Sequence, residues 1–69
     1  MTQCERVLKY IDDFGSISTR EAMIDLGVYR LASRIHDLRR MGVDIIKETA
    51  SSANRYGEIT HFAVYRRGE

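Results

Sequence analysis

The first half of the chain places its hydrophobic positions at helical spacing, starting near the amino end. Thr2 and Glu5 form the pattern T-x-x-E, a capping box in which each side chain bonds the backbone amide of the other residue. The apolar stripe that follows consists of Cys4, Val7, Leu8 and Ile11, with Phe14 at its end. The pattern predicts a helix over about residues 3–14 that stops at Gly15.

A second capping box begins a shorter helix. Ser18 and Glu21 enclose the sequence "STRE", and Gly27 provides a stop about two turns later. We expect the inward side of this helix to carry Ala22, Met23 and Leu26. The residues between the two helices, Ser16 and Ile17, are too few to predict a strand.

A third amphipathic stretch follows directly. Val28 and Tyr29 form the connection, and the predicted helix runs from about Arg30 to Met41 with Gly42 as its stop. Its apolar arc consists of Val28, Leu31, Ile35 and Leu38. Two capped helices that meet across a turn containing glycine have the outline of a helix-turn-helix.

After Gly42 the chain becomes rich in β-branched and aromatic residues. Residues 43–50 and 59–66 are the two predicted strands, and the polar stretch 51–58 separates them as a hairpin loop. The register is open, because Phe62 and Val64 share one side of the last strand while Ile59, Ala63 and Tyr65 share the other. The expected fold class is therefore α+β: a single domain, residues 1–69, with three helices followed by a two-stranded antiparallel β-hairpin.

Three segments of the chain also resemble a known family. "LGVYRLASRIHDLR", "MG" and "NRYGE" are similar to the small winged helix-turn-helix domain proteins of bacterial phages and mobile elements, and the resemblance covers nearly the whole chain. It implies a DNA-binding fold. One feature departs from a repressor-type helix-turn-helix: counted from Gly27, the apolar positions of the third helix fall at Leu31, Ile35 and Leu38, which the winged variety accommodates better.

Composition narrows the class of protein. With 69 residues, 43% hydrophobic and 30% charged, the chain is expected to fold as one small domain. It has one cysteine, no apolar run long enough to span a membrane and no signal peptide pattern, so we expect a cytoplasmic protein. His36, His61 and Cys4 lack metal-binding spacing, and no catalytic constellation stands out, so we expect neither an enzyme nor a cofactor.

Charge is concentrated on the third helix. The formal net charge is only +1, yet residues 28–40 carry four arginines and one aspartate, a local charge of +3. On a helical wheel the outward arc holds Tyr29, Ser33, His36, Asp37 and Arg40, with Arg30 beside it and Arg34 and Arg39 at the borders of the apolar face. Because an α-helix fits the major groove and arginine bonds guanine bidentately, this surface predicts binding to double-stranded DNA.

Individual contacts follow from this placement. We expect Arg30, Ser33, Asp37 and Arg40 to lie nearest the bases, with Tyr29 on the same surface and Arg34, Arg39 and Arg55 holding the backbone. The alternative is a solvated face, since Asp37 stands three residues from both Arg34 and Arg40 and an intrahelical ion-pair network explains part of the pattern.

Two further segments are candidates for phosphate contacts. On the hairpin loop, Arg55 is joined by the neutral donors Ser52, Asn54 and Tyr56. The alternative there is an ordinary turn, built by Asn54 and Gly57, with Tyr56 folded back on the body. Thr19 and Arg20 begin the second helix, where amides attract anions, although the Ser18 cap occupies some of them. Lys47, Arg66 and Arg67 are expected to be exposed and to aid solubility.

Two functions therefore remain open from sequence alone. The first is sequence-specific binding of double-stranded DNA by a small regulator or mobile-element factor, with a homodimer or tandem sites to extend the small footprint. The second is a protein-interaction module that has lost nucleic-acid binding. A near-neutral isoelectric point of about 7.9 favours the second, and Tyr29 and Tyr56 would suit a protein interface.

Overall fold

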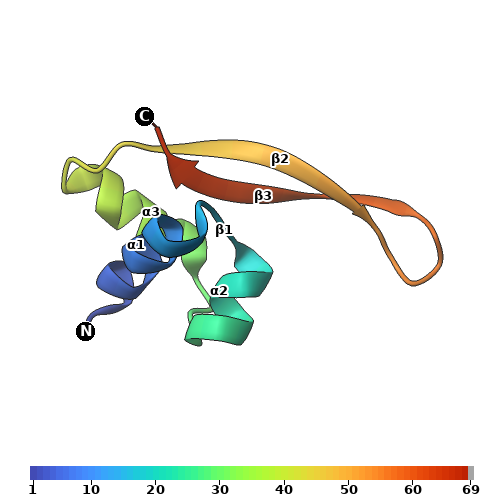
Figure 1. Cartoon of the computed structure of the whole chain (residues 1–69), viewed down its shortest axis with the longest axis horizontal. Helices are drawn as coiled ribbons and strands as arrows, with labels where there is room; N and C mark the ends of the chain where they lie inside the picture. The colour runs from blue at the N-terminus through green and yellow to red at the C-terminus, as the bar shows by residue number, and fades with distance from the viewer. Residues whose placement is uncertain (69) are drawn as a thin grey trace.

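The helices pack together as a body, and the two long strands extend past it as an arm (Figure 1). The computed structural model describes residues 1–68. Its elements are α1 (Gln3–Phe14), β1 (Ile17–Ser18), α2 (Thr19–Leu26), α3 (Leu31–Arg40), β2 (Ile45–Ala53) and β3 (Ile59–Arg67). The principal extents of 40 × 24 × 20 Å reflect this arm, which reaches beyond α2.

Both predicted capping boxes are confirmed. The Glu5 amide donates to Thr2 Oγ1 at 3.2 Å, and the Thr2 amide donates to Glu5 Oε1 at 2.9 Å. Ser18 and Glu21 repeat the arrangement at the start of α2 with the same two distances. The bond from the Thr2 amide also holds the pKa of the Glu5 carboxyl below its usual value. Local side-chain chemistry therefore sets where these two helices begin.

Two hydrophobic residues expected on inward faces are exposed. Met23 is 42% exposed because Ala22 and Leu26 occupy the inner side of α2, and Met23 lies about a quarter turn away. Phe14 is 72% exposed at the end of α1, where its ring packs on Tyr10 with centroids 4.7 Å apart. The third helix is one residue shorter at each end than expected, with Arg30 and Met41 as its caps.

The absence of a strand before α2 was a wrong prediction, and it changes the sheet. Ile17 and Ser18 form β1, which pairs antiparallel with β3 through Ile17 opposite Tyr65 and Ser18 opposite Val64. The sheet therefore has three strands in the order β1-β3-β2 instead of the two expected. Ile17 is fully buried, so this short pairing closes the core beneath the helices.

The register of the long hairpin settles which side of β3 faces inward. β2 and β3 pair from Ile45 opposite Arg67 to Ala53 opposite Ile59, which leaves a loop of only Asn54 to Glu58. Tyr65 is buried with Ile45, so their side of the hairpin faces the helices. Ile59 lies on the same side but is exposed, because the outer half of the hairpin extends past the body.

The core joins all three helices to the base of the sheet. Its buried hydrophobic residues are Val7, Ile11, Ile17, Ala22, Val28, Leu31, Ile35, Leu38, Ile45 and Tyr65. The apolar arc predicted for α3 is confirmed, since all four of its members are buried. Cys4 is half-buried at the edge of this cluster, which agrees with a packing role.

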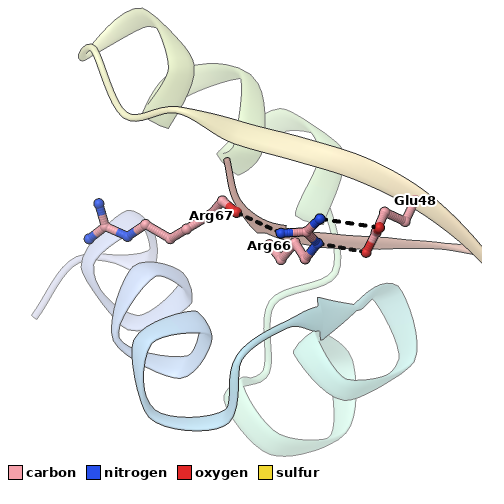
Figure 2. A network of polar contacts seen from close by, with 3 residues as sticks. All are labelled: Glu48, Arg66 and Arg67. Atoms are coloured by element: carbon pink, nitrogen blue, oxygen red, sulfur yellow. Dashed lines mark hydrogen bonds and ion pairs between the residues drawn. The ribbon is translucent and has the colours of Figure 1, made fainter. Parts of the chain in front are cut away.

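Arg66 and Arg67 are half-buried and ion-paired, so the expectation that they are merely exposed was wrong. The guanidinium of Arg66 donates to both carboxylate oxygens of Glu48 on β2 and to the Arg67 carbonyl (Figure 2). Arg67 donates to Asp12 of α1 through Nε at 2.9 Å and Nη2 at 3.1 Å. The Arg66 contacts hold the two strands together, and the Arg67–Asp12 pair ties the base of the hairpin to α1.

A hydroxyl group links α1 to α2. Tyr10 donates to Asp25 Oδ2 at 2.7 Å, with Glu21 Oε2 at 3.4 Å on the same hydroxyl. The hydrogen bond to Asp25 raises the pKa of Tyr10 to about 12, because the neighbouring carboxylates disfavour the phenolate. The two helices are thus held together by a polar contact as well as by the core.

The Asp12–Arg67 contact predicts a pH dependence of stability. Hydrogen bonding from Arg67 lowers the pKa of the Asp12 carboxyl in the folded state. The stabilisation is therefore complete above the ordinary carboxyl pKa of about 4, and it is lost as the pH falls through the lower folded value. In urea unfolding, Asp12→Asn should be less stable than the unsubstituted protein at pH 7, and the gap should close by about pH 2. An equal gap at both pH values would contradict the ion pair.

Candidate nucleic-acid interface

The outward surface of α3 carries two arginines that no acidic side chain neutralises. Arg30 and Arg40 are exposed, and neither forms an ion pair within residues 1–68. Tyr29 beside them is 72% exposed, and Ser33 between them is half-buried. This surface therefore presents two cations, a phenol and a hydroxyl along one helix of ten residues.

Asp37 pairs with only one of its two candidate partners. Its Oδ2 lies 3.1 Å from Arg34 Nη2, while Arg40 is left outside this contact. Arg34 is two-thirds covered, and its Nε atom is buried without a hydrogen bond within the described chain. The intrahelical network predicted as the alternative reading is therefore present in part, at the border of the surface and not across it.

Arg39 holds α3 to the start of the sheet. Its Nε and Nη2 donate to the Ile45 carbonyl at 3.1 and 3.0 Å. The sequence predicts Arg39 at the border of the apolar face, with contact to the DNA backbone as its only role. The remaining guanidinium hydrogens still leave donors for such a contact.

An open hollow joins α1 to the first turn of α3. Gln3, Tyr29, Arg30 and Arg34 line it, with a volume of about 260 Å³. Gln3 was not predicted as a site residue, because nothing in its local sequence connects it to residues 29–34. Its amide adds a neutral donor and acceptor beside the two arginines.

A second hollow brings the start of α2 to the arm. Its volume is about 270 Å³, and its lining consists of Ser18, Thr19, Arg20, Ser52, Thr60 and Phe62. Thr19 and Arg20 had been proposed as phosphate contacts independently of Ser52, and the fold places all three around one space. Thr60 and Phe62 were missed as site residues because only the register of the hairpin turns them to this side. The hollow combines hydroxyl groups with one cation, a set of donors suited to a phosphate or sugar.

The tip of the arm is a turn held by Asn54. Its Oδ1 accepts from the amides of Tyr56 at 2.9 Å and Glu58 at 3.0 Å, and its backbone amide donates to the Glu58 carbonyl. Asn54 therefore serves the turn, as the alternative reading predicted. Tyr56, however, is 85% exposed and does not fold back, so the turn presents both Arg55 and Tyr56 outward.

The near-neutral net charge conceals an uneven distribution. Most carboxylates of residues 1–68 are engaged: Asp12, Asp13, Asp37 and Glu48 in ion pairs, Glu5 and Glu21 in helix caps, Asp25 with Tyr10 and Glu58 with Asn54. The cations without an ion pair among the same residues are Arg6, Arg20, Arg30, Arg39, Arg40, Lys47 and Arg55. Hydrogen bonds to neutral groups leave the charge of Glu21 and Glu58 in place beside Arg20 and Arg55, so the clearest excess of unpaired positive charge lies at α3, on Arg39, Arg40 and the cap residue Arg30.

The described residues contain neither a metal site nor a membrane-spanning helix. Residues 1–68 contain no group of three histidine, cysteine, aspartate or glutamate side chains placed to hold a metal ion. Over the same residues, no helix has the length and apolar character needed to cross a membrane.

Comparison with known protein families identifies the family to which this arrangement of helices and strands belongs. A model of the winged helix-turn-helix domain family matches residues 2–66, which covers all three helices and nearly all of the sheet. No curated protein and no solved structure shows a significant match. DNA binding is the general property that this domain type suggests. From its helix-turn-helix, its three-stranded sheet and its long hairpin, and from this match, the chain belongs to the winged helix-turn-helix domain family.

Proposed function

We propose that the protein binds double-stranded DNA in a sequence-specific manner, with α3 in the major groove and the hairpin arm as the wing. The observation that carries the proposal is the pair Arg30 and Arg40 on the outward side of α3, both exposed and free of ion pairs within residues 1–68. At 1.5 Å per residue they lie about 15 Å apart along the helix, a span that fits within the major groove.

The exposure of each side chain on α3, and its hydrogen bonds and ion pairs, suggest which part of the DNA it contacts. In this proposal the exposed Arg40 and the half-buried Ser33 contact base edges, and the exposed Tyr29 and Arg30 extend the same surface just before the helix. Arg34 and Arg39 are held at the borders by Asp37 and by the Ile45 carbonyl, which suits contacts to the backbone on either side. Asp37 is then placed to accept from a cytosine amino group beside the guanines that arginines prefer.

Contacts outside α3 supply the remaining attraction to phosphates. Thr19 and Arg20 share one hollow with the inner part of the wing, so a backbone segment lying there meets both elements. Arg55 and Tyr56 project from the rigid tip, where the wing reaches the neighbouring groove or the backbone.

The biological role that fits this activity is a small transcriptional regulator or an accessory factor of a phage or mobile element. The support for this context is the resemblance of residues 26–39 and 54–58 to proteins of that kind. A domain of this size covers a short site, and useful specificity calls for two copies on the DNA.

A protein-interaction module without DNA binding is the second candidate. The observations that favour it are the net charge of +1 and the exposure of Tyr29 and Tyr56, since exposed aromatic residues are enriched in protein interfaces. We rank it second because three of the unpaired cations, Arg30, Arg39 and Arg40, lie on or beside α3, the helix that would enter the major groove.

Selection from a random pool of duplexes tests the proposal. The protein is incubated with the pool near physiological salt, and bound duplexes are recovered, amplified and sequenced over several rounds. We expect enrichment of a guanine-containing motif, because Arg30 and Arg40 are the outward arginines. A pool that stays random after repeated rounds, from protein shown to be folded, would overturn the sequence-specific reading.

A further inference from the structure

The outward side of α1 carries an apolar groove that the proposed DNA-binding surface does not use. Met1, Tyr10 and Phe14 line it together with Leu26 at the end of α2, and its volume is about 190 Å³. Met1 and Phe14 each leave 72% of their surface exposed. A groove lined by exposed apolar side chains and rimmed by charges is typical of an interaction site.

Opposite charges stand at the two ends of this groove. Arg6 lines its first half and has no ion pair within residues 1–68, and Asp13 lines its second half. Among residues 1–68, Asp13 forms an ion pair with Lys9 alone, at 3.3 Å, and both side chains are exposed. Seven residues separate Arg6 from Asp13, which is about two turns, so both lie along the same side of the helix. The two ends of the groove therefore differ: a cation without an ion pair among residues 1–68 stands at the first, and a carboxylate with its exposed partner Lys9, which also lines the groove, stands at the second.

We propose that a second copy of this chain packs its α1 antiparallel in the groove and forms a two-fold symmetric dimer. In that arrangement Arg6 of each copy lies opposite Asp13 of the other, so two identical ion pairs flank the axis. Tyr10 lies near the centre, and the Phe14 end of one helix covers the Met1 end of the other. An interface that carries complementary charges on one patch is self-complementary, as two-fold symmetry requires.

The dimer does not depend on DNA binding, because none of its residues belongs to the proposed DNA-binding surface. The groove is a poor match for a duplex, because its lining is mainly apolar and its cations, Arg6 and Lys9, are accompanied by the carboxylate of Asp13. The contact is small, because it involves essentially one helix of twelve residues from each copy. We therefore expect a weak dimer with a dissociation constant on the order of micromolar.

A charge swap tests the orientation directly. Sedimentation equilibrium is run over a concentration series on the unsubstituted protein, Arg6→Glu, Asp13→Arg and the double variant. Each single reversal places like charges opposite one another and should raise the dissociation constant by about tenfold or more. The double variant restores both ion pairs with their signs exchanged, and its dissociation constant should return to within about threefold of the original.

We expect both single variants to keep α1 helical, because the loss of the exposed Lys9–Asp13 pair in Asp13→Arg costs only a few tenths of a kcal/mol. A carboxylate near the start of a helix and a cation near its end both agree with the helix dipole. Circular dichroism of each variant should therefore match the unsubstituted protein. If the unsubstituted protein stays monomeric up to several hundred micromolar, or if the double variant is as weak as the singles, the proposal is overturned. A monomer that still binds DNA would overturn the dimer and leave the proposed function standing.

Discussion

Reversing the charges of Arg30 and Arg40 should abolish specific DNA binding while leaving the fold intact. Both side chains are exposed and neither has an ion pair within residues 1–68, so Arg30→Glu with Arg40→Glu removes two attractions and adds two repulsions to phosphates. We expect the dissociation constant for the selected duplex to rise at least about a hundredfold near 0.15 M salt. The free energy of unfolding should change by less than about 0.5 kcal/mol, since neither residue reaches the core.

A matched control shows whether the loss of binding depends on the position of the reversed charge or only on the net charge of the protein. Lys47→Glu makes the same change in net charge as either single arginine reversal, but on β2, outside the residues proposed to contact DNA. Fluorescence anisotropy with the same labelled duplex should show a much smaller loss for Lys47→Glu than for Arg40→Glu. Equal losses would indicate that only overall charge matters, and unfolding of the double variant would contradict the placement of these arginines off the core.

Ile35→Ala should remove much of the stability of the protein. Ile35 is 1% exposed at the centre of α3, within the cluster that joins the helices to the sheet. Truncating a buried isoleucine costs about 2–5 kcal/mol, and a domain this small has a total stability of only about 5 kcal/mol. Because the same helix carries Arg30 and Arg40, DNA binding should be lost together with the fold.

Ile24→Ala provides the matched control for the core substitution. It deletes the same atoms from a helical isoleucine, but Ile24 is exposed on α2. Its free energy of unfolding, measured by urea denaturation with circular dichroism, should stay within about 0.5 kcal/mol of that of the unsubstituted protein. If Ile35→Ala tolerated urea as well as Ile24→Ala, the assignment of the core face of α3 would be wrong.

Elements with local signals in the sequence were predicted well. The capping boxes at Thr2 and Ser18 and the glycine stops at Gly15 and Gly27 place α1 and α2 to within a residue, because each signal acts within one turn of helix. The 3.6-residue period of α3 correctly separated its buried arc from its charged one. Outward placement of Arg40 follows from that period, whereas Arg30 is exposed as the cap residue just before the helix.

Features that depend on distant pairing were missed. β1 is two residues long and is a strand only because β3 lies beside it, almost fifty residues later in the chain. Arg66 and Arg67 pair with carboxylates 18 and 55 residues away, so no local pattern distinguishes them from solvated cations. Gln3, Thr60 and Phe62 likewise reach the candidate interface only through tertiary packing and strand register.

The salt dependence of binding tests the central claim most directly, because phosphate contacts release counterions in proportion to their number. The dissociation constant for mixed-sequence duplex DNA is measured by anisotropy from about 50 to 300 mM salt. With about five phosphate contacts from α3, the start of α2 and the wing, we predict a slope of log affinity against log salt near −4.5. A slope near zero, or no binding at the lowest salt, would contradict DNA binding and favour a protein partner.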